Sequence, residues 1–332
     1  MINKKTKFCK AAALLGAAVM MISALAGCGK NTKVVLTAGL KKNEEFQISS
    51  ASCVLPEVMV YLTNMQNQYE SVYGSQIWNA SDGQLSLEQE EREQVLTQLA
   101  RIKVMNLLAQ KKEVTLDDKE KERAAAAGRE YFTSLNSAEV TALNVTQDLI
   151  TKMYEEYALA EKVYQTIVEN VNPEVSDDEA RTITVDMIRV SDSAKASQVL
   201  GKAKEEGVDF ETLAQAESED QTVTQSFGKG EVSEALEKAA FNLGKDEISD
   251  VVESDGSYYI LKCISTFDEA QTKANKEKIV KQRQSEAFDT EYTAFEQTLV
   301  RQLNEELWNS VTMIHQDDVK TSSFFEVYQL SL

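Results

Sequence analysis

Residues 182–190 read TITVDMIRV, and in this stretch the periodicity of the chain changes from that of a helix to that of a strand. Ile183, Val185 and Met187 recur at every second position, which is typical of a β-strand with one face toward a core. The elements expected after this strand are helices over residues 194–206, 210–214 and 234–241 and a second strand over residues 257–264. This order predicts a small α+β domain, which we place at residues 173–267 because a proline ends the preceding helix.

The segment before this domain, residues 46–172, predicts helices that pack on one another. Ser86 and Gln89 have the spacing of a capping box, and the apolar residues after them recur at helical spacing. Pro56 suits the first turn of another helix, since its missing N–H group would have no partner there. Two more helices are expected, one beginning near residues 115–118 and one over residues 146–169. These residues are therefore expected to form a helical lobe.

A long helical pattern follows the α+β domain, from residue 268 to about residue 308. Its apolar stripe includes Phe288, Phe295 and Leu303, and at 1.5 Å per residue such a helix would be about 60 Å long. The α+β domain is too small to cover it, so its second half must pack against the N-terminal helices. The predicted fold class is α+β: a discontinuous helical domain, built from residues 46–172 and 268–332, with the small α+β domain inserted between its two parts.

The first 27 residues have the features of an export signal. Four lysines and no acidic residue precede an apolar run at residues 11–25, which is too short for an ordinary membrane-spanning helix. Residues 25–28, Leu-Ala-Gly-Cys, resemble the lipobox of bacterial lipoproteins, in which the cysteine is acylated. We therefore expect a signal peptide at residues 1–27, a lipid on Cys28, a tether over residues 28–45 and an anchor on the outer face of the cytoplasmic membrane. The alternative is an uncleaved anchor with a coincidental cysteine.

The composition argues against several classes of function. The chain has 54 acidic and 35 basic side chains, and its net charge of −19 repels phosphate backbones, so no nucleic-acid partner is expected. The single histidine, His315, argues against a histidine-rich metal site and a Ser-His-Asp triad, and neither a metal nor a cofactor is expected. Cys53 and Cys263 lie in apolar stretches without CxxC spacing, a pattern compatible both with two buried thiols and with a disulfide.

Five short motifs in the α+β segment resemble those of the parvulin-type peptidyl-prolyl isomerases. They are GVDFETLA at residues 207–214, SED at 218–220, EKAAF at 237–241, GKDEIS at 244–249 and DGSYYIL at 255–261. Together with the lipobox, the helical segments and the long C-terminal helix, they make the whole chain similar to the extracytoplasmic foldase lipoproteins of the PrsA and SurA group. The resemblance implies that unfolded secreted polypeptides are the partners and that isomerisation of their prolyl bonds is the activity.

The resemblance also implies a set of site residues. A prolyl isomerase needs no cofactor, because it binds the proline ring in an apolar pocket and stabilises the twisted amide, which lies about 18–20 kcal/mol above the planar one. Asp220 stands where the family has cysteine or aspartate, near the carbonyl group that turns. The resemblance assigns Phe227, Val232 and Leu236 to the pocket, and it places Met187 and Tyr258 at the positions of the family's paired histidines. Asp220 and Tyr258 are the catalytic candidates.

The chain departs from the family pattern at several of these positions. Both histidines are absent, a glycine-rich loop before the pocket is missing, and Val232 and Leu236 replace larger side chains. Asp220 is also compatible with a solvated surface position, and Met187 with a core position. We therefore expect a foldase or chaperone with a parvulin-like domain whose isomerase activity is weak or lost. The alternatives are a fully active isomerase and a structural or solute-binding lipoprotein.

A chaperone that binds unfolded chains needs exposed apolar surface, with or without an active isomerase pocket. The aromatic residues Trp78, Trp308, Phe324, Phe325 and Tyr328 either provide such a surface or belong to the core. The C-terminal segment that contains the last three is expected to be a docking strand or the end of the folded body.

Overall fold

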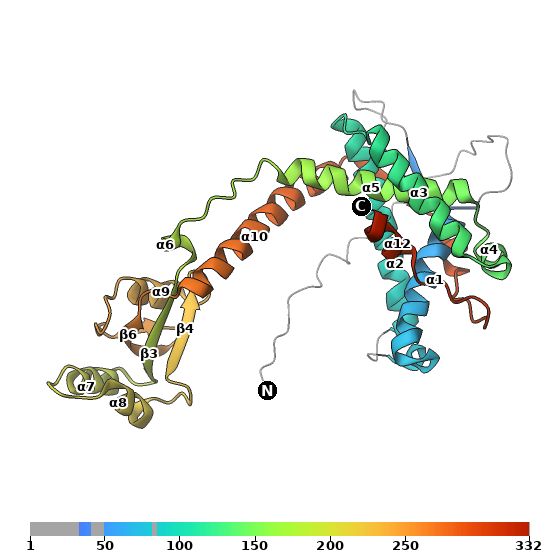
Figure 1. The fold of residues 1–332 in the computed structure, drawn as a ribbon. Coiled ribbons are helices and arrows are strands. Elements are labelled where there is room, and N and C mark those ends of the chain that lie inside the picture. The colour runs from blue at the N-terminus through green and yellow to red at the C-terminus, as the bar shows by residue number, and fades with distance from the viewer. Residues whose placement is uncertain (1–32, 41–49, 82–84, 332) are drawn as a thin grey trace.

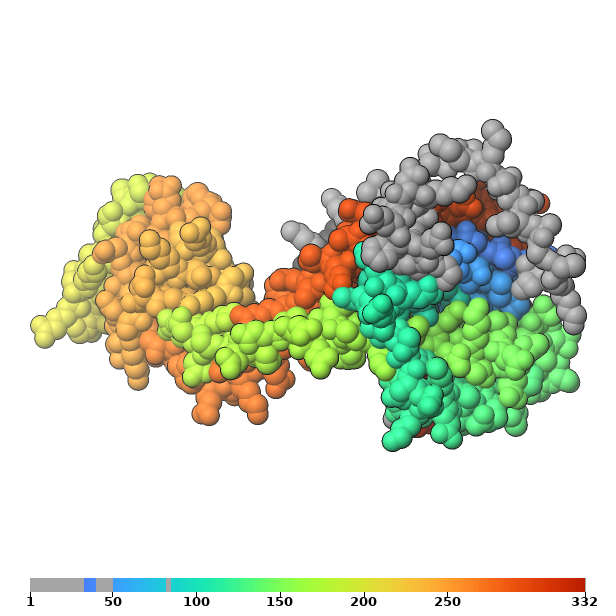
Figure 2. All heavy atoms as spheres, turned by 90° about the horizontal axis from the view of Figure 1, so that it is seen from above, coloured from blue at the N-terminus to red at the C-terminus, as the bar shows by residue number. Residues whose placement is uncertain are grey.

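The structure is a computed structural model that describes residues 33–40, 50–81 and 85–331, so the expected signal peptide and Cys28 lie outside the described residues. Figure 1 shows a helical lobe and a smaller α+β module at opposite ends of the long helix α10 (Glu269–Glu296). In the space-filling view of Figure 2, a narrow bridge joins the two bodies. Within the described residues, no helix combines the length and the apolar character needed to cross a membrane.

The helices of the lobe begin where the sequence signals place them. They are α1 (Leu55–Tyr73), α2 (Leu87–Lys111), α3 (Asp118–Ser134) and α5 (Gln147–Val168), with the short helices η1 (Ser75–Asn79) and α4 (Ser137–Leu143) between them. The Gln89 N–H group donates to the Ser86 hydroxyl and the Ser86 N–H group donates to the Gln89 side chain, so the predicted capping box is confirmed. Asp117 and Glu120 form a second capping box at α3. Helix α4 was not expected from the sequence.

The C-terminal segment supplies the centre of the lobe's core. Helix α12 (Phe324–Ser331) inserts Phe324 among Tyr61, Tyr131 and Tyr154, and its ring stacks on that of Tyr154 with 4.4 Å between centroids. The Tyr154 hydroxyl donates to the Phe324 carbonyl at 2.8 Å. Trp308 and Tyr328 are also buried, whereas Trp78 and Phe325 are half-buried. The C-terminal aromatic residues therefore stabilise the lobe rather than form an exposed surface.

A three-stranded sheet corrects two expectations about the ends of the chain. Strand β1 (Val34–Leu40) pairs antiparallel with β2 (Ala51–Val54) on one side and with β7 (Leu299–Leu303) on the other. Residues 34–40 are thus part of the lobe and not of a tether. The long C-terminal helix ends at Glu296, and short helix α11 (Glu305–Asn309) follows β7. Pairing with β7 buries Leu299 and provides hydrogen-bond partners for the backbone on the second side of β1, which a helix continuing beyond the lobe would not provide.

The return of the C-terminal segment to the N-terminal helices confirms the discontinuous helical domain. Phe288 and Phe295 of α10 lie in one core cluster with residues of α2 and α5. Beyond α10, Asn67 of α1 donates to the Thr321 carbonyl at 2.7 Å, and the Phe324 N–H group donates to Asn64 at 3.0 Å. The lobe is therefore assembled from both ends of the chain.

The α+β module is built on a four-stranded antiparallel sheet in the order β4-β3-β6-β5. Its strands are β3 (Thr182–Val190), β4 (Thr224–Gly228), β5 (Val252–Ser254) and β6 (Ser257–Ser265), and its helices are α6 (Asp177–Ala180), α7 (Ser193–Ala203), α8 (Phe210–Glu217) and α9 (Glu234–Phe241). Strands β3 and β6 and helix α9 confirm the predicted elements. The short strands β4 and β5 were not predicted.

Helices cover the two faces of this sheet. Helix α9 packs on the face that carries Ile183, Val185 and Met187, while α7 and α8 pack on the face that carries Ile188 and Val190. Cys263 lies in the core under α9 and Cys53 in the core of the lobe, and both are free thiols. The two cysteines belong to different cores, which favours buried thiols over a disulfide.

Helix α10 is held at both of its ends. At the module end, the Asn275 amide donates to the Ala180 carbonyl at 2.9 Å, and Arg283 forms an ion pair with Glu179 at 2.6 Å. At the lobe end, Phe288 packs against Tyr164. The helix therefore fixes the spacing between the module and the lobe.

Candidate functional site

The apolar face of the module's sheet brings together most of the residues expected to form a pocket. Met187 of β3, Phe227 of β4 and Leu236 of α9 belong to one cluster and are 5–8% exposed. Val232, just before α9, packs against the same cluster and is half-buried. These four residues therefore form an apolar patch under α9 whose accessible edge includes Val232.

The position of α9 over this face follows from local interactions. The Ser233 hydroxyl accepts from the Leu236 N–H group and so caps the first turn of the helix. The same hydroxyl lies 2.7 Å from the Ser254 hydroxyl on β5, which ties the start of α9 to the edge of the sheet. Gly230 has φ of +79°, a conformation that favours glycine in the turn leading into the helix.

Tyr258 lies on the other face of the sheet from the remaining candidates. It packs against the cluster of Ile188 and Val190 under α7 and α8, whereas its neighbour Tyr259 packs against the cluster of Met187. Successive side chains of a strand point to opposite faces, so a shift of one residue moves a side chain out of the site. The aromatic residue that the structure brings to the cluster of Met187 is Tyr259, which was not among the site residues predicted from the sequence.

Asp220 lies at the edge of the apolar face and is bound by an arginine. Its Oδ1 atom accepts from Arg189 Nε at 2.8 Å, and the two side chains are 35% and 27% exposed. Arg189 is two positions after Met187 on β3 and stands opposite Tyr259 in the register of β3 and β6. Asp220 is therefore not an isolated solvated carboxylate but half of an ion pair beside the pocket residues.

The loop that carries Asp220 is fixed to the end of β3. The Ser218 hydroxyl accepts from the backbone N–H groups of Arg189 and Asp220, and the Glu219 N–H group donates to the Arg189 carbonyl at 2.8 Å. The Glu219 carboxylate accepts from the N–H and hydroxyl groups of Ser191. These contacts hold both carboxylates of the loop next to the Arg189 guanidinium.

The electrostatics of the cluster follow from these contacts. The hydrogen bond to Asp220 raises the pKa of the Arg189 guanidinium, and Glu219 and Tyr259 act in the same direction. Hydrogen bonds from the backbone of Ser191 lower the pKa of the Glu219 carboxyl. At neutral pH the cluster therefore contains one cation between two anions.

The sequence contains a signal for the position of Arg189. Extending the alternation of Ile183, Val185 and Met187 by one step places Arg189 on the apolar face, where a charged residue is unusual. The partner of Arg189 could not be read from the sequence, because Asp220 is 31 residues away along the chain. The described residues contain no group of three His, Cys, Asp or Glu side chains suited to a metal ion.

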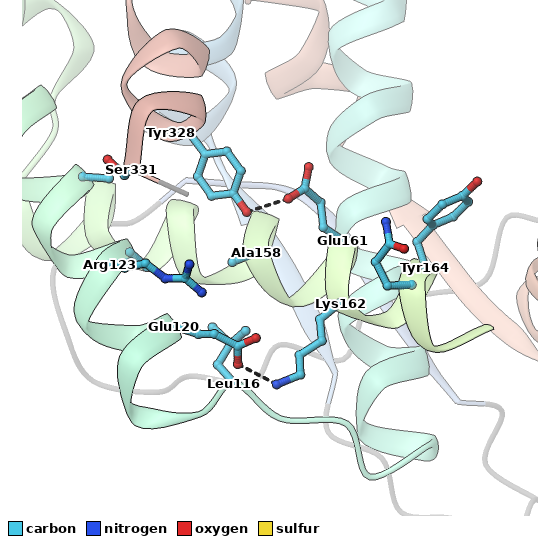
Figure 3. A pocket seen from close by; sticks show the side chains of 12 residues that line it. Leu116, Glu120, Arg123, Ala158, Glu161, Lys162, Tyr164, Tyr328 and Ser331 are labelled. Atoms are coloured by element: carbon cyan, nitrogen blue, oxygen red, sulfur yellow. Dashed lines mark hydrogen bonds and ion pairs between the residues drawn. The ribbon is translucent and has the colours of Figure 1, made fainter. Parts of the chain in front are cut away.

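A cavity of about 660 Å³ lies in the helical lobe between α3, α5 and α12, as Figure 3 shows. Small apolar residues line part of it, among them Ala124, Ala127 and Ala158. An ion pair between Lys162 and Glu120 and a hydrogen bond from Tyr328 to Glu161 lie at its rim. The cavity therefore combines an apolar floor with a charged rim.

The end of α1 exposes a second apolar surface on the lobe, which we call the α1 tip and define as Tyr69, Val72, Tyr73 and Trp78. Val72 is 71% exposed and Tyr73 is 57% exposed. The Tyr69 ring lies 6.3 Å from that of Tyr73 and 5.7 Å from that of Trp78. Tyr69 and Trp78 are half-buried, so the exposed part of the α1 tip is Val72 and Tyr73. Exposed apolar side chains that lie together are typical of a protein-binding surface.

Comparison with known proteins identifies the module. Residues 161–278 match the family described as the PPIC-type PPIASE domain. This chain carries a parvulin-type domain. The Foldase protein PrsA of Streptococcus pneumoniae strain Hungary19A-6 is 31% identical over 165 residues, which are 44% of this chain and 53% of that protein, and PrsA of strain CGSP14 gives the same values. The chain thus spans about half the length of the curated relatives it matches.

Solved structures of the same kind of protein are also similar to this chain. The peptidylprolyl isomerase PrsA from Bacillus cereus is 19% identical, covers 73% of this chain and 91% of its own, and superimposes with a TM-score of 0.38. The foldase protein PrsA from Streptococcus pneumoniae strain Canada MDR_19A is 23% identical, covers 73% and 92% respectively, and gives a TM-score of 0.28. The five motifs quoted from the sequence, at residues 207–261, lie within residues 161–278, the segment that the family model matches.

Proposed function

We propose that this chain is a membrane-anchored, extracytoplasmic foldase in which the helical lobe holds unfolded secreted polypeptides and the parvulin domain has weak or lost isomerase activity. The match of residues 161–278 to the PPIC-type domain carries this proposal, and the relatives that match the chain are named foldases. The proposed organisation is a helical domain of residues 46–172 and 268–332, extended at its start by β1, with the parvulin domain at residues 173–267.

Two features of the parvulin domain support weak or lost activity. Met187, Phe227 and Leu236 are almost completely covered, so a proline ring would reach mainly Val232 and Tyr259 at the edge of the patch. The Asp220 carboxylate is bound by Arg189 and is therefore less available to a substrate than a free carboxylate would be. Both features should lower the rate at which the pocket of the parvulin domain catalyses isomerisation.

The α1 tip supports a role in holding unfolded chains. Such a role requires apolar side chains that solvent reaches, and Val72 and Tyr73 meet this condition. The cavity between α3, α5 and α12 offers a second apolar contact with a charged rim. Each of the two surfaces would accept apolar side chains of an unfolded polypeptide.

The anchor proposed at Cys28 would keep the lobe close to the membrane. The Leu55 N–H group donates to the Lys33 carbonyl at 2.9 Å, which ties Lys33 to the start of α1. Five residue steps separate Cys28 from Lys33, and a fully extended chain of that length spans about 18 Å. A lipid on Cys28 would therefore hold the helical lobe, and not the parvulin domain, next to the bilayer.

An aggregation assay tests the proposed function. The chain from residue 28 onward, with Cys28→Ser, should slow the aggregation of an unfolded client protein at stoichiometric concentration. Val72→Ser with Tyr73→Ser should reduce this suppression several-fold, whereas Leu330→Ser should not, although Leu330 is 77% exposed on another helix. A chain that leaves aggregation unchanged would contradict the proposal, and equal suppression by both variants would exclude the α1 tip as the binding surface.

A fully active prolyl isomerase is the second candidate. The complete parvulin sheet, with an accessible edge at Val232 and Tyr259, favours it. Measurement of cis–trans isomerisation of proline-containing tetrapeptides separates the two candidates. A rate equal to the uncatalysed rate would leave only the holding activity.

A further inference from the structure

Arg189 is a cation on the apolar face of the parvulin sheet. It follows Ile183, Val185 and Met187 on the same face of β3, and it stands opposite Tyr259 on β6. Its side chain is 27% exposed, so solvent and a bound peptide can reach it. A guanidinium in this position borders the patch against which a proline ring would pack.

The guanidinium is held on one side and open on another. Its Nε atom donates to Asp220 at 2.8 Å, and its Nη1 atom lies 3.6 Å from Glu219 Oε2. Within the described part of the chain, Nη2 forms no hydrogen bond. Because Asp220 fixes the orientation of the planar group, this remaining nitrogen is a preorganised donor.

Prolyl isomerisation places a specific demand on such a donor. As the imide twists, conjugation between nitrogen and carbonyl is lost, and the lone pair of the prolyl nitrogen becomes a hydrogen-bond acceptor. A cationic donor aimed at the twisted amide stabilises that state more than the planar ground state, which lowers the barrier. The rotation breaks no covalent bond and transfers no proton, so Arg189 needs only to donate a hydrogen bond.

We propose that Arg189 is the residue that contacts the twisting prolyl amide, and that Asp220 is a positioning residue that holds its guanidinium. Tyr259 and Val232 provide the apolar surface for the proline ring. This inference rests on the proposed function with its isomerase activity weakened but not lost, or on the second candidate, the active isomerase. It also changes the role that the sequence suggested for Asp220, from contact with the twisting amide to positioning of Arg189.

Either Arg189 or Asp220 contacts the prolyl amide, and the two alternatives predict opposite effects of an Arg189 substitution on the isomerisation rate. If Arg189 contacts the amide, Arg189→Gln lowers kcat/KM about tenfold to hundredfold, the range for loss of one hydrogen bond from a charged group, and Arg189→Lys retains part of the rate. Asp220→Asn then lowers kcat with little change in KM, because the guanidinium is still present but less well oriented. If Asp220 contacts the substrate, Arg189→Gln leaves the rate unchanged or raises it, since the carboxylate is released.

The experiment uses the chain from residue 28 onward with Cys28→Ser and proline-containing tetrapeptides. Lys204→Gln is the matched control, because Lys204 is an exposed cation that follows α7, on the opposite side of the sheet, and pairs only with Asp250 among the described residues. The melting temperature of each variant must equal that of the parent, which excludes unfolding as the cause of a loss of activity. Suppression of client aggregation should be the same in all four variants.

The possible results test the role of Arg189 and the proposed foldase function separately. A parent that isomerises the peptides, together with an unaffected Arg189→Gln variant, would overturn the role of Arg189 and leave the foldase proposal standing. A parent no faster than the uncatalysed reaction would overturn the inference together with the isomerase activity, while the aggregation assay would still decide the holding activity. We expect that only the Arg189 and Asp220 variants lose isomerase activity. For Asp220→Asn the loss should appear in kcat and not in KM.

Discussion

At the scale of single residues, one ammonium group balances two carboxylates in the core of the helical lobe. Lys103 Nζ lies 2.7 Å from Glu57 Oε2 and 2.5 Å from Glu156 Oε2, and Lys103 and Glu57 are both 1% exposed. Burial raises the pKa of the Glu57 carboxyl above its usual range, although Lys103 opposes this shift. Burial acts to lower the pKa of Lys103, but the two carboxylates outweigh it and raise that pKa.

Replacement of Lys103 with methionine should destabilise the lobe by about 3–5 kcal/mol at neutral pH, because it leaves the buried Glu57 carboxylate without a cation. The folded-state pKa of Glu57 would then lie still further above its unfolded value, so stability is lost as pH rises through the folded-state pKa. The variant should therefore be less destabilised at pH 5 than at pH 8 in urea unfolding followed by circular dichroism.

Lys152→Met is the control for this prediction. Lys152 also pairs with Glu156, at 3.5 Å, but is 55% exposed, so its removal should cost about 0–1 kcal/mol. If Lys103→Met and Lys152→Met lower the free energy of unfolding equally, burial of the ion pair does not determine the cost of removing its lysine.

At the scale of elements, the short helix α4 holds the C-terminal segment against the lobe. Its capping residue Asn136 accepts from the Glu139 N–H group and donates to the Asp318 carbonyl. The buried Glu139 carboxylate accepts from the N–H groups of Lys320 and Thr321 at 2.9 and 2.8 Å. The first turn of α4 is therefore also a binding site for the C-terminal segment.

Glu139→Ala should lower the free energy of unfolding by about 3 kcal/mol, because it leaves two backbone donors without a charged acceptor and removes part of the capping box. Glu122→Ala on α3, an exposed glutamate, should change it by less than about 0.5 kcal/mol. The comparison is made by thermal or urea unfolding. Similar values for the two variants would mean that the C-terminal segment is held by its apolar contacts alone.

At the scale of the whole molecule, the lobe is completed only when the chain returns from the parvulin domain. Strand β7 pairs with β1, and Phe324, Trp308 and Val311 lie in the same core cluster as residues of α1 and α2. The parvulin domain is joined to the lobe through α10 and the segment after α5, which form the bridge of Figure 2. Folding of the lobe therefore depends on residues at both ends of the sequence.

A chain that stops after Gln297 should lose the cooperative unfolding transition of the lobe, because β1 loses a partner strand and the core loses Phe324. The transition of the parvulin domain should persist, since its two cores contain no residue beyond 263. Calorimetry distinguishes the two transitions. A chain that stops after Gln329 is the control and should melt as the full chain does, since Leu330 is exposed and Ser331 is half-buried.

The candidate site was predicted in part from the sequence. Met187, Phe227, Val232 and Leu236 do meet on one face of the sheet, because the alternation in β3 and the capping signals of α9 are local. Tyr258 was misplaced by one residue, and Tyr259 occupies the site face instead. Asp220 was selected, but its ion pair with Arg189 depends on how the loop after α8 packs against the end of β3.

The sequence alone determined the long helices of the lobe, the central strands of the parvulin domain and the insertion of one domain into the other, because periodicity and capping are encoded within a few residues. Only the tertiary structure decided that residues 299–303 form a strand. Their apolar spacing suits a helix as well as a strand, and only the strand also provides hydrogen-bond partners for the backbone of β1. Pairings between distant residues, as in β1 with β7 and Arg189 with Asp220, leave no periodic trace in the sequence.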